Sequence, residues 1–291
     1  MKPLHTRLQE ARKHLGIPWE VLERDYILSW ILAAITEVQG LEGTLIFKGG
    51  TALKKCYFGD YRFSEDLDFS GMENVPTGEA MEEAMRETCE VAVSMLDEYA
   101  PIEILCERYT EREPHPGGQE AFTIRARLPW HRTPQTRVMI EIAVDEKILK
   151  PIQERTVIHN YGEPLKINVK TYALKEIIAE KLRAILQHVQ QLHTRGWSRS
   201  RARDYYDLWR VLNAYRERLN LSNFSAFLRE KCALRSVSYK GTDDFFPETM
   251  LKDVERTWDQ GLGRLVPNLP AFGTVIGELY PQIASLIVCA Q

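Results

Sequence analysis

The sequence predicts an α/β (α+β) protein in which a mixed α/β half precedes a mainly helical half. In the first half, strand-like runs alternate with helical patterns, and an apolar run at 44–47 ends in two glycines before residues that favour helix. After Thr171 the pattern becomes helical. A Gly-Glu-Pro sequence at 162–164 marks the boundary. We therefore expect an α/β domain over 1–164 and a helical domain over 165–291.

The elements are justified by periodicity. The apolar run at 27–35 contains Ser and is too short to span a bilayer, so it is interpreted as a buried helix. Residues 66–70 and 137–145 alternate polar and apolar side chains, as strands do. Residues 174–185 repeat their aliphatic side chains at helical spacing. We expect helices at about 3–15, 18–39, 50–57, 78–99, 172–193, 202–217 and 222–231, and strands at about 44–47, 66–70, 102–109, 120–128 and 137–145.

Three further segments are less regular. Prolines and glycines at 113–118 predict a hairpin connection between two strands. Residues 157–169 are compatible with another short strand pair. Residues 232–275 contain many Gly and Pro and give no clear prediction.

Composition limits the class of protein. With 291 residues the chain is long enough for two domains, and 44% apolar and 27% charged residues are ordinary for a soluble globular protein. The five cysteines are scattered and form no Cys-x-x-Cys, which favours free thiols in a reducing, cytoplasmic environment over a disulfide framework or zinc site. No signal peptide is recognisable at the N-terminus, and we expect no membrane association.

The net charge of −3 conceals an uneven distribution. Residues 60–113 contain 16 acids and 4 bases, a net charge of −12, whereas residues 166–218 contain 12 bases and 5 acids, a net charge of +7. The basic stretch suits a triphosphate, a nucleic acid or both, or is a solvated helix face. The acidic stretch is interpreted as a solvated helix at 78–99, or as a surface that meets a basic partner.

A glycine turn follows the first expected strand. A strand, a Gly-Gly turn and a helix start present bare backbone N–H groups to a phosphate at Gly49 and Gly50. Thr51 is a helix cap, a phosphate contact or both. Lys48 is a phosphate contact or a solvated charge. The absence of a Gly-Lys-Ser/Thr ending excludes a P-loop.

Two carboxylates follow closely. In a strand over 66–70, Asp66 and Asp68 point to one side and Leu67 to the other. Such a pair repels itself unless a cation lies between the two groups, and Mg²⁺ accepts one or two carboxylates together with substrate phosphates. Ser64, two residues earlier, is a candidate contact for a phosphate or the metal shell. The alternative is a surface turn with solvated acids.

These residues carry a resemblance to a known family. The blocks 47–53, 62–69, 173–182 and 201–208, in this order, resemble the AbiEii/AbiGii-type toxins (MenT-like), which are nucleotidyltransferases of the DNA polymerase β-like superfamily from type IV toxin–antitoxin and abortive-infection systems. The resemblance implies a polymerase β-like domain with a mixed sheet and a helical C-terminal domain. Arg203 stands where the family's fourth motif usually has Lys, which keeps the charge but replaces a point charge with a planar fork.

The resemblance also implies site roles. Asp66 and Asp68 would hold Mg²⁺ (or Mn²⁺), and Glu141, on a neighbouring strand, would be a third carboxylate acting as metal ligand or base. Lys181 would point at the triphosphate, and Asp204 would hold Lys181 or the nucleotide. From the residues alone, Glu141 is equally a solvent-facing strand residue, Lys181 a snorkelling lysine on an apolar stripe, and Asp204 a helix cap.

The expected activity is transfer of a nucleoside monophosphate from an NTP to an acceptor hydroxyl, by resemblance the 3′ end of tRNA. The alternatives are a small-molecule or protein acceptor, or a non-catalytic NTP-binding regulator. Expected partners are an NTP, tRNA, and a cognate antitoxin protein or its promoter-binding partner. A cationic run with one aromatic ring suits RNA contact or is simply an exposed loop; its members are Arg195, Trp197, Arg199, Arg201 and Arg203.

Overall fold

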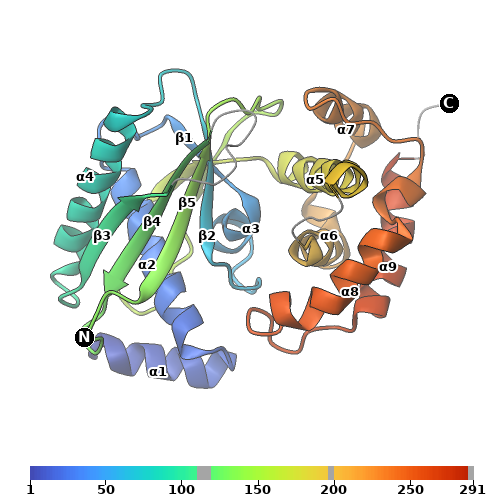
Figure 1. The fold of residues 1–291 in the computed structure, drawn as a ribbon. Coiled ribbons are helices and arrows are strands. Elements are labelled where there is room, and N and C mark those ends of the chain that lie inside the picture. Colours follow the sequence, from blue (N-terminus) through green and yellow to red (C-terminus); the bar gives the residue numbers. More distant parts are fainter. Residues whose placement is uncertain (110–118, 196–199, 288–291) are drawn as a thin grey trace. The chain divides into compact units, whose positions relative to one another are not determined.

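The computed structural model describes residues 1–109, 119–195 and 200–287, without the side chains of 193–195. The chain forms two compact units (Figure 1). The first contains Met1–Glu146 and Ile152–Tyr172, and the second contains Lys147–Pro151 and the described residues from Ala173 onward. The division falls after Tyr172 rather than after residue 164, because the strand at Asn168–Thr171 pairs into the sheet of the first unit.

A mixed sheet forms the centre of the first unit. In the described part of the chain its order is β3-β4-β5-β2-β1-β7-β6. β2 is parallel to β5 and β1 to β7, and the other neighbouring pairs are antiparallel. The mixed sheet agrees with the predicted fold class. The strands are β1 (Leu45–Lys48), β2 (Asp66–Gly71), β3 (Glu103–Arg108), β4 (Gln119–Arg127), β5 (Thr136–Ala143), β6 (Gln153–Thr156) and β7 (Asn168–Thr171).

The expected strands are found, with one shift. In the last pair, β6 ends just before the segment 157–169 that was considered for it, and β7 overlaps only the last two residues of that segment. The hairpin predicted at 113–118 lies outside the described residues, although β3 and β4 are antiparallel neighbours.

Helices cover one face of this sheet. α2 (Trp19–Ile35) and α4 (Glu79–Leu96) pack against each other, and they contact β5 and β3 respectively (Figure 1). Apolar residues that alternate along the strands face them, among them Leu67, Phe69 and Ile140, each at most 2% exposed. The other helical segments of the unit are α1 (Leu4–Leu15), the one-turn α3 (Gly49–Ala52) and a π-helical turn at Leu53–Tyr57.

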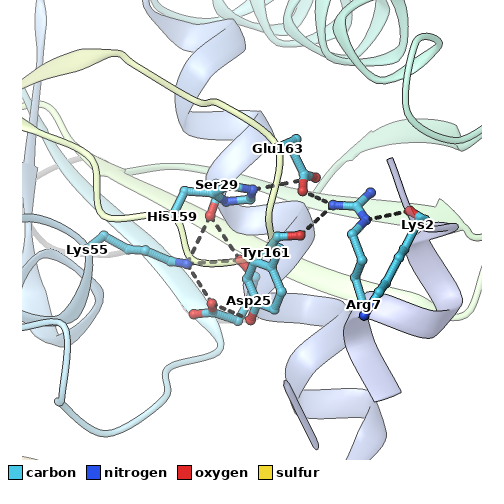
Figure 2. Close-up of polar contacts among 8 residues, drawn as sticks. All are labelled: Lys2, Arg7, Asp25, Ser29, Lys55, His159, Tyr161 and Glu163. Carbon is cyan, nitrogen blue, oxygen red and sulfur yellow. Dashed lines mark hydrogen bonds and ion pairs between the residues drawn. The ribbon is translucent and has the colours of Figure 1, made fainter. Parts of the chain in front are cut away.

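A buried polar network fixes the π-helical turn to α2 (Figure 2). The Lys55 ammonium donates to Asp25 Oδ2 at 2.6 Å, and the Tyr161 hydroxyl donates to the same oxygen at 2.8 Å. Burial opposes ionisation of Asp25, but the ammonium groups of Lys55 and Lys54 hold the pKa of this carboxyl below its usual value. The helix that continues from the glycine turn is therefore anchored to the first unit's core.

The second unit is helical, as expected. It contains α5 (Leu174–Arg195), α6 (Ala202–Ala214), α7 (Phe224–Ala233), α8 (Glu248–Leu262) and α9 (Phe272–Ile287), with 3₁₀ turns at Arg216–Arg218 and Thr242–Phe245. α8 and the start of α9 occupy the stretch that gave no prediction. Among the described helices, none is both long and apolar enough to cross a membrane.

The segment 147–151 belongs to the helical unit because two charged side chains fix its backbone. Lys231 donates to Glu176 Oε1 at 2.8 Å, and both side chains are fully buried. Lys231 also donates to the carbonyl of Lys147 at 2.9 Å, and the backbone N–H of Leu149 donates to Glu176 Oε1 at 3.2 Å. A connection between two strands of the first unit is thus part of the second.

Candidate active site

The glycine turn packs directly against a carboxylate. β1 ends at Lys48 and the helical turn α3 begins at Gly49, whose φ is +77°. A Cβ at this position would lie 2.2 Å from Asp68 Oδ2 and 3.2 Å from Asp68 Cβ. Gly49 therefore combines a left-handed backbone with an approach that any side chain would obstruct.

Thr51 joins this turn to the next strand. Its hydroxyl donates to the backbone carbonyl of Asp66, and the side chain is buried. The helix-cap role considered for Thr51 is wrong, because Lys48 occupies the N-cap position and α3 has no side-chain cap. The threonine instead fixes the start of β2 beneath the turn.

Strand register assembles the carboxylates into one row. Asp68 pairs with Lys48 on β1 and with Glu141 on β5, and Asp66 pairs with Met139 on β5. Paired residues of neighbouring strands project to the same face, so Lys48, Asp66, Asp68 and Glu141 share one side of the sheet. All four are partly exposed. This face is opposite to the one covered by α2 and α4.

Ser64 does not belong to this row through strand alternation. β2 begins at Asp66 after a bend at Glu65, so strand alternation does not extend back to Ser64. The serine is nevertheless buried, with 6% exposure. A salt bridge from α2 holds this approach to the strand: Arg24 pairs with Glu65 and donates from Nε to the carbonyl of Arg137 at 2.8 Å. No sequence pattern predicted these two contacts of Arg24 with Glu65 and with β5.

The donor chemistry of the row fits a hard divalent cation. Carboxylate oxygens are the ligands that Mg²⁺ and Mn²⁺ prefer, and Mg²⁺ commonly combines one or two of them with substrate phosphates. Among the residues that the structure describes, no group of three or more His, Cys, Asp or Glu is placed to hold a metal ion by itself. Asp66 and Asp68 share one face of β2, and Asp68 lies against Gly49, so this pair has the chemistry of carboxylate ligands for such a cation.

A hollow elsewhere on the first unit does not belong to this row. It has a volume of about 660 Å³, and Phe47 and Phe69 are among the residues that line it. These two residues alternate with Lys48 and Asp68 along their strands and so face the opposite side of the sheet. The hollow adds nothing to the carboxylate face.

The second unit contains its own charged cluster. Lys181 on α5 contacts Asp204 Oδ1 at 2.9 Å and Asp207 Oδ2 at 2.8 Å, and the Asp207 side chain is fully buried. Burial opposes ionisation of Asp204, but Lys181 and then Arg201 hold the pKa of its carboxyl below the usual value. The helix-cap role considered for Asp204 is wrong, because Arg201 occupies the N-cap position of α6. Asp204 pairs with Lys181 instead.

A histidine that the sequence did not single out extends this cluster. Arg201 contacts Asp204 Oδ2 at 3.3 Å and donates from Nε to His188 Nδ1 at 3.4 Å. Burial, followed by the charge of Arg201, lowers the pKa of His188 to about 4, so its ring is neutral at pH 7. Arg201 thus belongs to the lysine–aspartate cluster, and Arg203 lies on α6 with partial exposure.

The remaining members of the suggested RNA-contacting run are not described. Trp197 and Arg199 lie outside the described residues, and the side chain of Arg195 does as well. The run therefore stays a prediction.

The carboxylate row and the glycine turn together suit an enzyme that acts on a nucleoside triphosphate. The turn packs against one carboxylate strand, and a second carboxylate strand lies parallel to the first in a mixed sheet. The family model described as "Nucleotidyl transferase AbiEii toxin, Type IV TA system" matches residues 30–280. The chain therefore belongs to the AbiEii family of nucleotidyltransferase toxins, whose type IV systems pair the toxin with an antitoxin.

A solved structure supports the fold independently. The chain is similar to the nucleotidyltransferase toxin MenT4 from Mycobacterium tuberculosis H37Rv, with a TM-score of 0.57 and 19% identity over 94% of this chain and 85% of that chain. At this identity the likeness concerns the fold alone. No curated protein sequence matches this chain significantly.

Proposed function

We propose that this nucleotidyltransferase moves a nucleoside monophosphate from an NTP to the 3′-terminal hydroxyl of tRNA in the cytoplasm, and that the modified tRNA halts translation. The observation that carries the proposal is the row of Asp66, Asp68 and Glu141 beside the backbone of Gly49. The row offers cation ligands and the turn offers N–H donors, which are the two requirements for binding a triphosphate.

Each residue of the row has a distinct task. Asp66 and Asp68 would hold Mg²⁺ or Mn²⁺, and the backbone of Gly49 and Gly50 binds phosphate oxygens. The bound cation supplies charge neutralisation for the triphosphate and the leaving group. Glu141, in register with Asp68, accepts the proton of the attacking hydroxyl. The hydroxyl oxygen bonds to the α-phosphorus while the bond to the bridging oxygen breaks, and pyrophosphate leaves.

Lys181 contributes a cation that Asp204 and Asp207 hold in place. Its ammonium offsets negative charge that develops on the triphosphate in the transition state. Two carboxylates contact this ammonium group, Asp204 at 2.9 Å and Asp207 at 2.8 Å, and fix its position. The proposed role follows the family resemblance of the motif at 173–182.

The proposal that tRNA is the acceptor is supported by the family resemblance and by the positive charge of the helical unit's sequence. Residues 166–218 carry a net charge of +7, which suits a polyanion. The purified protein is incubated with α-labelled NTPs and, separately, total tRNA, protein extract or small-molecule hydroxyl acceptors. Label on the RNA 3′ end supports the proposal, and label only on protein or small molecules contradicts the acceptor. Tight NTP binding without pyrophosphate release contradicts the reaction.

The site itself is tested with Asp66→Asn combined with Asp68→Asn. We expect transfer to fall by about 100-fold or more, because the isosteric amides lose the charge that binds the cation. The matched control is Asp97→Asn at the exposed end of α4, which should keep wild-type transfer. Equal melting temperatures would separate catalysis from folding. Undiminished transfer by the double variant would contradict the assignment of these carboxylates.

A further inference from the structure

The hairpin of β4 and β5 carries a concentration of positive charge. Residues 125–137 contain four arginines and no acid. This stretch lies between the acidic region 60–113 and the basic region 166–218, so its positive charge is not counted in either. The hairpin includes the strand that bears Glu141, and its two strands lie side by side (Figure 1). The arginines are Arg125, Arg127, Arg132 and Arg137.

Two of these arginines oppose each other. Arg125 on β4 pairs directly with Arg137 on β5. Side chains of such a pair begin about 5 Å apart on one face, where like charges destabilise the sheet. An anion that binds between the two guanidinium groups would offset this repulsion.

The neighbours of the pair do not neutralise it. Within the described part of the chain Arg137 forms no ion pair: its guanidinium contacts Thr123 Oγ1 at 3.5 Å and Met139 Sδ at 3.1 Å. Arg125 lies 3.5 Å from Glu107, but both side chains are substantially exposed, at 40% and 62%. An exposed ion pair of this kind contributes little and exchanges readily with another anion.

The pair lies on the reacting face, on the far side of the carboxylates from the glycine turn. Arg137, Met139 and Glu141 alternate along β5 to the same side, which places Arg137 about 13 Å from Glu141. Across the sheet the order is β1 with the glycine turn, β2 with Asp68, β5 with Glu141, and then β4 with Arg125. A triphosphate at the turn and an anion at the arginines would thus flank the carboxylates from opposite sides.

Building on the proposed function, we infer that Arg125 and Arg137 bind a backbone phosphate of the RNA acceptor, upstream of the 3′ hydroxyl that reacts. A chain that presents its terminal hydroxyl to Glu141 and continues along β5 passes over this pair. Arg24 supports the geometry, since its bond to the carbonyl of Arg137 fixes the backbone and leaves the guanidinium exposed. The pair is a substrate-positioning element and takes no part in the chemical step.

The test compares Arg125→Gln/Arg137→Gln with the control Arg12→Gln/Arg86→Gln, which removes the same charge from exposed positions on α1 and α4. The probe is a 5′-fluorescein RNA ending in CCA with a free 3′ hydroxyl, titrated over a KCl series. We expect the Kd for RNA to rise about tenfold and the salt slope to fall by about 0.7, the value for one single-strand phosphate contact. The KM for NTP should stay within about twofold of wild type.

Two further readouts exclude a structural role. The double Gln variant should melt at or above the wild-type temperature, because a like-charge pair is removed. Arg125→Lys/Arg137→Lys should retain the salt slope, because phosphate binding needs the charges.

Each of the following outcomes overturns the inference. RNA affinity and salt slope equal to those of the control variant show that the pair does not bind RNA. A raised KM for NTP with unchanged RNA affinity assigns the pair to the triphosphate instead. A wild-type protein that neither binds nor modifies RNA removes both this inference and the proposed acceptor, whereas RNA modification that is independent of the arginines removes only this inference.

Discussion

Replacing Gly49 by alanine tests the contact between the glycine turn and the carboxylate row. The structure indicates two free-energy costs of this substitution, one from backbone conformation and one from packing. A φ of +77° is unfavourable for alanine by about 1–2 kcal/mol. The new Cβ would also meet Asp68 Oδ2 at 2.2 Å and Asp68 Cγ at 3.1 Å, so the carboxylate must move. We expect a stability loss of about 1–3 kcal/mol and a much larger loss of transfer, about 100-fold, because Asp68 no longer aligns with Glu141.

A matched glycine separates the two costs. Gly16 has a similar φ of +66°, but a Cβ there would have no heavy atom within 4 Å. Gly16→Ala should therefore lower stability by about 1 kcal/mol and leave transfer and NTP binding unchanged. Gly59, without positive φ and with the side chain of Ile158 at 3.5 Å, accepts alanine at little cost.

The assays are a melting curve for each variant, NTP binding by calorimetry with Mg²⁺, and initial rates of transfer to total tRNA. For a domain of this size each kcal/mol shifts the melting temperature by about 2–4 °C. If Gly49→Ala melts like Gly16→Ala and keeps wild-type transfer, the packing of the turn against Asp68 has no functional consequence, contrary to this prediction.

Three other predictions concern buried charges. Lys181→Met leaves Asp207 buried without its cation, so it should lower the free energy of unfolding by about 3–5 kcal/mol and abolish transfer. Adding Asp207→Asn should restore stability but not transfer. A double variant that transfers normally would contradict the proposed role of the lysine. Glu176→Gln should destabilise more than Glu176→Leu with Lys231→Met, by melting temperature, because only the single change strands a buried charge; equal losses would argue against this. Burial, then the charge of Lys55, lowers the pKa of His159 to about 3, so protonation of this ring favours the unfolded chain. The free energy of unfolding should therefore fall as the pH drops below about 6.5, by about 2 kcal/mol at pH 5. His159→Gln should flatten that dependence.

Local patterns predicted much of the fold, and long-range pairing accounts for the exceptions. The strands at 66–70 and 137–145 were found because their alternation is a property of adjacent residues. The short strand β7 was not assigned to the first unit, since only its pairing with β1 decides that. α8 and the start of α9 lie in the segment 232–275, which is rich in Gly and Pro and gave no clear prediction, and α9 also contains Pro281.

The same distinction applies to the candidate sites. Sequence spacing put Asp66 and Asp68 on one strand face and Lys181 on the inner stripe of a helix. The pairing of Asp204 with Lys181 was one of the roles considered, and it is observed. His188 and Arg24 were missed because each is recognised only by a partner on another element, Arg201 for His188 and Arg137 for Arg24.

The glycine turn, the carboxylate strand and the family motifs can be recognised from the amino-acid sequence alone, because each depends on backbone conformation or spacing within a few residues. Three features became visible only in the folded chain: Glu141 lies in register with Asp68, Arg125 opposes Arg137, and the segment 147–151 belongs to the helical unit. Strand register and buried ion pairs depend on which distant segments meet. A shift of one residue in the pairing of β5 would turn Glu141 and Arg137 to the other face of the sheet.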